Sequence, residues 1–193
     1  MSIQSFSDYV VESSKEVTFT FGRYNPPTIG HEILFNKLKA VARAGNYRIY
    51  ASQSEDEKKN PLPYKDKMKF LRKMFPKHAR SIILDTKVRN VFDVLVNMYD
   101  EGFKRVTMVV GSDRVKEFEI LINKYNGVKG RHGFYKLSLN VVSAGERDPD
   151  SDGADGMSAS KMRLAAQQND LKSFSSGLPN NFKGTEDLFN AVR

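Results

Sequence analysis

The sequence predicts an α/β fold: a parallel sheet of five strands with helices on both faces. The first observation is that short apolar runs rich in strand formers alternate with longer segments of helical periodicity. The second is that glycine-containing turns follow two of these runs and lead directly into a helix, at residues 22–31 and 111–114. Such alternation requires a crossover between successive strands, which favours parallel strands with right-handed connections.

Length and composition limit the classes of protein to which the chain can belong. Its 193 residues suit one domain, since single domains usually run ~100–200 residues, and we expect that domain over residues 17–193. The absence of cysteine excludes disulfides, thiol catalysis and Cys-ligated metal. No apolar run approaches the ~18 residues of a membrane span. A net charge of +8 suits an anionic partner, nucleotide or nucleic acid alike.

The first strand and the turn after it organise the rest of the chain. Residues 17–21 (VTFTF) alternate apolar and polar strand formers and end at Gly22. Two prolines hold the following loop extended, and helical spacing then runs over residues 29–44. His31 therefore lies in the first turn of a helix that follows a strand, where free backbone N–H groups favour a phosphate. The alternative is that His31 merely caps a surface helix.

This stretch resembles the first signature of the nucleotidylyltransferase superfamily, Rossmann-like enzymes whose first loop ends in His/Thr-x-Gly-His. The motif here is Thr28-Ile29-Gly30-His31, and it follows the lead-in Gly22-Arg23-Tyr24-Asn25-Pro26-Pro27. The tetrad alone recurs by chance, but its place between a strand and a helix is the context that the signature requires.

Next come a second strand, a charged loop and a basic helix. Residues 47–51 are predicted as the strand, residues 52–63 as a loop at its ligand end, and residues 64–75 as the helix. Most lysines of this helix are expected to form a solvated face. Lys65 and Lys67 open the helix directly after the loop, where they could reach a ligand phosphate.

The middle of the chain predicts three further strands, at residues 81–84, 105–110 and 137–142, with a helix starting at Thr86 or Asn90 after the first of them. The run 105–110 is almost wholly apolar, as in a central parallel strand. It ends in Gly111-Ser112-Asp113, which resembles the Val-Gly-x-Asp turn that lies over the nucleotide in the same superfamily.

Residues 157–163 (MSASKMR) resemble the second signature of the superfamily, Ile-Ser-Ser-Thr-x-x-Arg. Ser158 can cap the helix that follows, and its hydroxyl and the nearby N–H groups form a phosphate cradle. The preceding acidic loop, 146–156, lacks the ligand spacing of a Ca²⁺ site, and we interpret it as solvated. Beyond residue 169 we expect a short helix, a turn at residues 177–179 and a last helix that packs on the domain.

The N-terminal segment, residues 1–16, has the spacing of a short amphipathic helix. Its SFSDYVVESS run resembles the targeting peptides of internal head proteins in large tailed phages, with Glu12 as the matching cleavage site. That resemblance implies a phage-encoded protein located in the cytoplasm of the infected cell, or packaged in the virion. An ordinary tail is the alternative.

The superfamily resemblance implies transfer of a nucleoside monophosphate from a triphosphate, most simply ATP, to a phosphorylated small-molecule acceptor, with release of pyrophosphate. It implies Mg²⁺ carried by the triphosphate, and no metal ligands on the protein. It assigns catalysis to His31, Thr28 and Arg163, and acceptor binding to Lys65 and Lys67. Nucleotide binding falls to Gly22, Arg23, Tyr24, Asn25, Pro26, Gly30, Gly111, Asp113, Ser158, Ser160 and Lys161.

The branch of the superfamily is a separate question. Thr28 and the lead-in are more similar to adenylyltransferases, such as those acting on nicotinamide mononucleotide or phosphopantetheine, than to cytidylyltransferases, which more often carry His at this place. Cytidylyl transfer to a phosphorylated alcohol or sugar remains an alternative. So does a non-catalytic virion or nucleic-acid-associated protein that keeps the fold, although no nucleic-acid motif is present. We expect no membrane partner, and the sequence leaves a homo-oligomer open.

Overall fold

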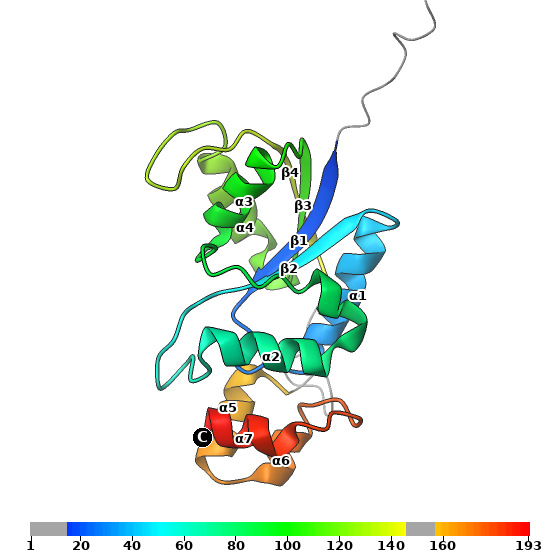
Figure 1. Cartoon of the computed structure of the whole chain (residues 1–193), viewed down its shortest axis with the longest axis vertical. Helices are drawn as coiled ribbons and strands as arrows, with labels where there is room; N and C mark the ends of the chain where they lie inside the picture. The colour runs from blue at the N-terminus through cyan, green and yellow to red at the C-terminus, as the bar shows by residue number, and fades with distance from the viewer. Residues whose placement is uncertain (1–14, 146–156) are drawn as a thin grey trace, which may run out of the picture.

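A parallel sheet of four strands forms the centre of the computed structural model, which describes residues 15–145 and 157–193. The strand order is β2-β1-β3-β4, and every neighbouring pair is parallel. Because β1 is paired on both sides, its carboxyl end lies between the carboxyl ends of β2 and β3 (Figure 1). The strands are β1 (Glu16–Gly22), β2 (Asn46–Ala51), β3 (Arg105–Val110) and β4 (Ser138–Ser143).

Helices cover both faces of this sheet, as predicted. Alternate residues of β3 point to opposite faces, so Val106 and Met108 belong to one hydrophobic cluster and Val109 to the other. The face of Val109 is covered by α1 (Gly30–Ala42), which buries Phe35 and Leu38. The face of Met108 is covered by α3 (Val91–Asp100) and α4 (Val115–Lys124).

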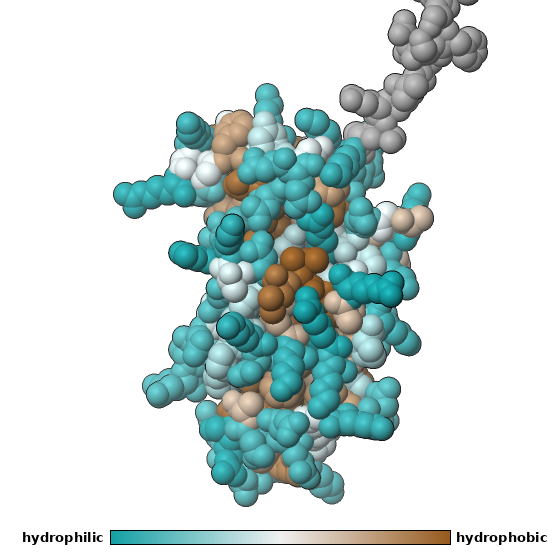
Figure 2. Space-filling model, in the orientation of Figure 1, coloured by the Kyte–Doolittle hydropathy of each residue, from teal (hydrophilic) through white to brown (hydrophobic). Residues whose placement is uncertain are grey.

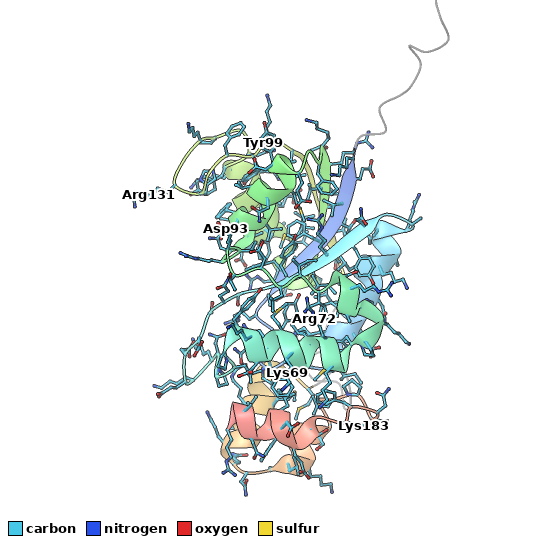
Figure 3. The ribbon with its side chains drawn as sticks, viewed as in Figure 1. Lys69, Arg72, Asp93, Tyr99, Arg131 and Lys183 are labelled. Atoms are coloured by element: carbon cyan, nitrogen blue, oxygen red, sulfur yellow. The ribbon has the colours of Figure 1, made fainter. Side chains whose placement is uncertain are left out.

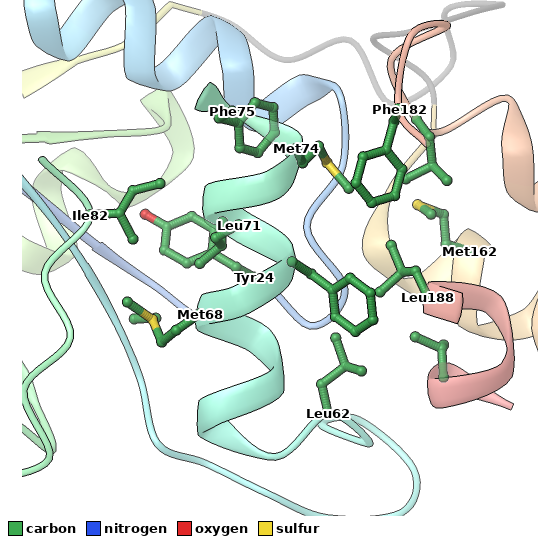
Figure 4. Packing of buried hydrophobic residues seen from close by; sticks show 14 of the residues in the cluster. Tyr24, Leu62, Met68, Leu71, Met74, Phe75, Ile82, Met162, Phe182 and Leu188 are labelled. Carbon is green, nitrogen blue, oxygen red and sulfur yellow. The ribbon is translucent and has the colours of Figure 1, made fainter. Parts of the chain in front are cut away.

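The remaining helices lie beyond the carboxyl ends of the strands, below the sheet in Figure 1. Figure 4 shows α2 packed between two groups of side chains, with Tyr24 and Ile82 on one side and Phe182 and Leu188 on the other. The C-terminal helices thereby join the core on the α1 side. These helices are α2 (Tyr64–Met74), α5 (Ala159–Gln167), α6 (Leu171–Ser175) and α7 (Thr185–Val192), with short 3₁₀ turns η2 (Pro76–Ser81) and η3 (Ser112–Arg114).

The predicted strand at residues 81–84, the third of the five expected along the chain, is wrong. Ser81 still belongs to η2, and only Ile82 pairs with the sheet, through a single parallel bridge to Ile49. The N–H of Ile83 still donates to the Ile49 carbonyl of β2. After Ile83 the backbone bonds to a side chain instead of a strand, because the N–H of Asp85 donates to the Tyr64 hydroxyl. The segment has strand-forming residues, but these competing partners end the ladder after one residue.

Two predicted features fall outside the described residues: the N-terminal segment with its targeting-like run, of which residues 1–14 are not described, and the acidic loop 146–156. The helix start that the sequence left open is settled, because Asn90 caps α3 and accepts from the N–H groups of Phe92 and Asp93. Within the described chain, no helix is long and apolar enough to cross a membrane.

His78 ties three elements together in the interior. It lies in η2, is 2% exposed, and its Nδ1 accepts from the Tyr47 hydroxyl of β2 at 3.1 Å. Its Nε2 donates to Oδ1 of Asn36 in α1 at 3.2 Å, so the neutral Nε2–H tautomer satisfies both partners. Burial lowers the pKa of His78, and the charge of Lys39 lowers it further.

We expect His78 to make the fold sensitive to acid. Because its folded pKa lies below the unfolded value of about 6.5, the neutral ring stabilises the fold above that pH. This stabilisation is lost as the pH falls through the unfolded and then the folded pKa. Denaturant unfolding of the wild type and His78→Gln at pH 7.5 and pH 5 should show a smaller acid-induced loss in the variant. An equal loss in both proteins would contradict this role.

Candidate active site

A cavity of about 960 Å³ opens at the carboxyl ends of all four strands. In a parallel α/β sheet this edge is where ligands bind, because the helices that follow the strands turn their amino ends toward it. The loop after β1 lies between the cavity residues that follow β2 and those that follow β3, because β1 lies between these strands in the sheet. The wall therefore has a β2 side, formed by Ser52, Ser54, Arg89 and Asn90, and a β3–β4 side, formed by Gly111, Asp113, Phe118, Ala144 and Gly145.

The loop between β1 and α1 is held in place from three distant parts of the chain. The side chain of Asn25 makes two hydrogen bonds to the backbone of Leu62, at 3.0 and 3.2 Å. The N–H of Ile29 donates to the Gly177 carbonyl at 2.8 Å. Nη1 of Arg163 donates to the Asn25 carbonyl at 2.7 Å. These bonds satisfy the polar groups of a buried loop and fix its path.

Tyr24 folds back over the end of β1. A Cβ built on Gly22 would lie 2.6 Å from Cζ of the Tyr24 ring, so the loop requires glycine there. The ring meets His31 edge to face, with centroids 4.9 Å apart. Burial raises the pKa of the Tyr24 phenol, which thus stays neutral. Its hydroxyl is buried without a hydrogen-bond partner: Thr20 lies close enough to oppose the rise in pKa, but not in hydrogen-bonding geometry.

His31 has a fixed orientation in the first turn of α1. The N–H of Thr28 donates to Nδ1 of His31 at 2.8 Å, and the Thr28 hydroxyl lies 3.1 Å from the same atom. Because Nδ1 is the acceptor, the proton of the neutral ring is on Nε2. Thr28 itself is fully buried, so it acts by holding the imidazole at the cavity wall.

The turn after β3 brings a carboxylate to the cavity. Oδ1 of Asp113 lies 2.7 Å from where a Cβ on Gly111 would be, so the side chain folds over the glycine. Arg114 is paired with Glu117 at 2.7 Å and lies over the ring of Phe118. On the α1 side of the cavity, Ile33 leaves half of its surface exposed. The Phe118 ring is a flat apolar group, and the Asp113 carboxylate beside it is a hydrogen-bond acceptor. A nucleoside base and ribose need these two features.

The sequence places the loop 52–63 at the ligand end of β2, but it singles out none of the four residues that line the β2 side of the cavity. Ser52 and Ser54 follow β2, and Arg89 and Asn90 precede α3, so all four come from loops without a fixed motif spacing. For Arg89 and Asn90 the signal was the capping sequence Asn90-x-x-Asp93, because it places a helix amino end at this sheet edge. Among the described residues no carboxylate pairs with the Arg89 guanidinium, which makes this side suitable for an anionic ligand.

The second signature lies against the first loop rather than in the cavity wall. Ser158 caps α5 and accepts from the N–H of Lys161 at 3.1 Å, as predicted. Nη2 of Arg163 donates to the Ser160 hydroxyl at 3.0 Å. Burial and the charge of Arg23 both lower the pKa of Arg163, which remains charged at any physiological pH. Two neighbouring guanidinium groups favour an anion between them.

The structure therefore brings together part of the predicted set. The cavity wall contains Gly22, Arg23, Tyr24, Gly30, His31, Gly111 and Asp113. The other predicted residues do not line the cavity: Thr28, Asn25, Pro26, Ser158, Ser160, Lys161 and Arg163. Neither Lys65 nor Lys67 lines it: Lys65 is exposed on α2, and Lys67 is fully buried with its amino group on the Ser52 carbonyl at 2.6 Å.

Over residues 15–145 and 157–193, no group of three His, Asp or Glu side chains is arranged to hold a metal ion.

The fold is similar to that of a nicotinic acid mononucleotide adenylyltransferase from Plasmodium falciparum. That enzyme complexed with NaAD superposes with a TM-score of 0.60 at 13% identity, covering 92% of this chain and 97% of the other. Its complex with APC gives 0.58 at 12% identity, with the same coverage. No family model and no curated protein matches the sequence. At this identity the likeness establishes the fold, an α/β fold shared with a nucleotidyltransferase.

We predict that Gly22→Ala displaces the Tyr24 ring and weakens ligand binding. The added methyl overlaps the ring, which should cost about 1–3 kcal/mol of stability and about tenfold in ATP affinity. Gly102→Ala is the matched control: Gly102 has φ +85° and open space around it, far from the cavity wall. It should lose about 1 kcal/mol of stability with ATP affinity unchanged. Calorimetry that finds equal ATP affinity in both variants would contradict the prediction.

Proposed function

We propose that the chain is a nucleotidyltransferase that moves AMP from ATP onto a phosphorylated small-molecule acceptor and releases pyrophosphate. The observation that carries the proposal is the oriented His31 at the wall of a cavity that has one side for a nucleoside and one for a second anion. The likeness in fold to an adenylyltransferase supports it, as do both sequence signatures.

The reaction needs no protein nucleophile. An oxygen of the acceptor phosphate attacks the α-phosphorus in line, a new P–O bond forms, and the bond to the bridging oxygen of the leaving pyrophosphate breaks. The protein contributes position and fixed donors for the charge that develops on the phosphoryl oxygens. Nε2–H of His31 donates to the α-phosphate, because Thr28 holds the other ring nitrogen.

Two cations at the first loop attract the leaving group, Arg23 from the cavity wall and Arg163 from behind the loop. Arg23 lines the cavity directly, and Arg163 places its charge against the same loop through the Asn25 carbonyl. Ser160 orients the Arg163 guanidinium, and the amino end of α5 adds the partial positive charge of its free N–H groups. Mg²⁺ would arrive on the triphosphate and neutralise part of its charge.

The two sides of the cavity take the two substrates. Gly111 and Asp113 hold the ribose of the donor, with the base against Ile33 and Phe118. The acceptor lies on the β2 side, near Ser52, Ser54 and Arg89. Nicotinic acid mononucleotide is the first acceptor to test, because the similar structures belong to an enzyme named for it, and nicotinamide mononucleotide is the second.

The assay follows both products. The protein is mixed with Mg²⁺, each nucleoside triphosphate in turn, and each phosphorylated acceptor, and pyrophosphate and the dinucleotide are measured. We expect turnover with ATP and a pyridine mononucleotide. Turnover with CTP and a phosphorylated alcohol or sugar instead would move the assignment to cytidylyl transfer.

His31→Ala should lower turnover by ~10²–10³, the usual effect of losing one preorganised donor. ATP binding should change much less, since the donation strengthens only as charge develops in the transition state. Steady-state kinetics and calorimetry on the same preparations separate the two effects. Near-normal turnover in a well-folded variant would remove His31 from the mechanism.

Arg163→Ala should impair triphosphate use strongly, because it removes both a charge and a hydrogen bond to the first loop. Lys69→Ala and Lys73→Ala should do little: Lys69 projects from the exposed side of α2 (Figure 3), and Lys73 pairs only loosely with Asp187 at 3.9 Å. The same variants test whether the protein binds nucleic acid. Tight, salt-sensitive duplex binding that depends on Lys69 and Lys73 but not on Arg163 would overturn the enzyme assignment.

A further inference from the structure

Lys67 is a fully buried lysine behind the β2 side of the cavity. It lies in the first turn of α2, and its Nζ donates to the Ser52 carbonyl at 2.6 Å. No carboxylate of the described residues forms an ion pair with it; Glu55 acts on it only from a longer distance. Its neighbours on the same helix, Lys65 and Lys69, are exposed.

This position is unfavourable for a positive charge in two ways. A buried ammonium loses its hydration, and one carbonyl oxygen replaces only a part of it. The amino end of a helix also carries a partial positive charge and prefers anions. Burial accordingly lowers the pKa of Lys67 to about 8, with Glu55 opposing the shift. A lysine kept in such a place points to a use for its charge.

Ser52 connects this ammonium to the cavity, because it lines the cavity and its carbonyl contacts the amino group of Lys67. The N–H of Ser52 donates to the Gly22 carbonyl at 2.8 Å, which joins the end of β2 to the end of β1. Its carbonyl accepts from Lys67, and its hydroxyl is buried without a partner in the described chain. Since Ser52 lines the cavity, an anion bound there lies across one residue from the Lys67 charge.

We propose that Lys67 is a positioning residue for the acceptor: its buried ammonium fixes the end of β2 through the Ser52 carbonyl, and the phosphate of the acceptor balances its charge across Ser52. The inference rests on the proposed function and adds a residue that acts without touching the substrate. It replaces the direct phosphate contact that the sequence predicts for Lys67.

The charge has opposite effects on the free and the bound protein. The folded pKa of about 8 lies below the unfolded value near 10.4, so the folded state binds fewer protons between these two values. Burying the charge therefore weakens the free protein at neutral pH, and this loss diminishes as the pH rises from 8 to 10.4. A phosphate across Ser52 favours the charged form, so the acceptor should bind less tightly above pH 8.

The test compares Lys67→Met with Lys69→Met, an exposed position on the same helix. At pH 7 the Lys67 variant should melt at a higher temperature than the wild type, yet its KM for nicotinic acid mononucleotide should be about 10-fold higher, with the ATP Kd within about twofold. Between pH 7 and 9.5 the wild-type acceptor KM should rise, and that of the Lys67 variant should stay flat and high. The Lys69 variant should follow the wild type throughout.

Equal acceptor KM values and pH profiles in the two variants would overturn the inference while leaving the proposed function intact.

If no acceptor is turned over, inorganic phosphate serves as the probe. Its stabilisation of the wild type should be larger at pH 7 than at pH 9.5, with that difference lost in Lys67→Met, and the inference then survives without the proposed function. A phosphate effect that is the same in both proteins overturns it. Should the Met variant not fold, a flat wild-type pH profile is sufficient to reject it.

Discussion

The structure depends on how the buried loop between β1 and α1 satisfies its polar groups. A loop that crosses the interior needs partners for its peptide groups, and an unpaired one costs about 1–3 kcal/mol. Here the partners come from the segment before α2, the turn after α6 and the side chain of Arg163. The C-terminal helices are therefore part of the site's architecture, because two of the three anchors come from them.

This anchoring explains why the residues of the two signatures have different roles. The side chains of Arg163 and Asn25 form hydrogen bonds that hold the loop in place, and the N–H of Thr28 donates to His31. The residues that remain for a ligand are those with exposed polar groups or no side chain, such as Arg23 and Gly30. A place in one of the two signatures thus does not imply that a residue lines the cavity.

The sequence predicted the sheet, both faces of helices and the two signature loops, because each rests on local periodicity and turn chemistry. The face in Figure 2 is mostly hydrophilic, with a hydrophobic patch near its middle. The strand predicted at residues 81–84 was wrong because its residues have strand propensity, while the partners that end it, such as the Tyr64 hydroxyl, lie far away in sequence. Lys67 was misplaced for a related reason: its spacing fits an exposed helix start, and only the tertiary packing shows that it is buried.

Unsatisfied polar groups gather around the cavity. Of the buried side-chain atoms in the described residues, those without a hydrogen-bond partner are the Tyr24 hydroxyl, the Ser52 hydroxyl and Oδ1 of Asn60, and both hydroxyls belong to residues of the cavity wall. The uncompensated ammonium of Lys67 lies directly behind one of them. Native interiors contain few such groups, so their concentration at one sheet edge indicates that stability has been given up there. An anion bound in the cavity would oppose this loss through its charge, which would balance the Lys67 ammonium across Ser52, and the region that weakens the free protein would then be the one that the ligand stabilises most.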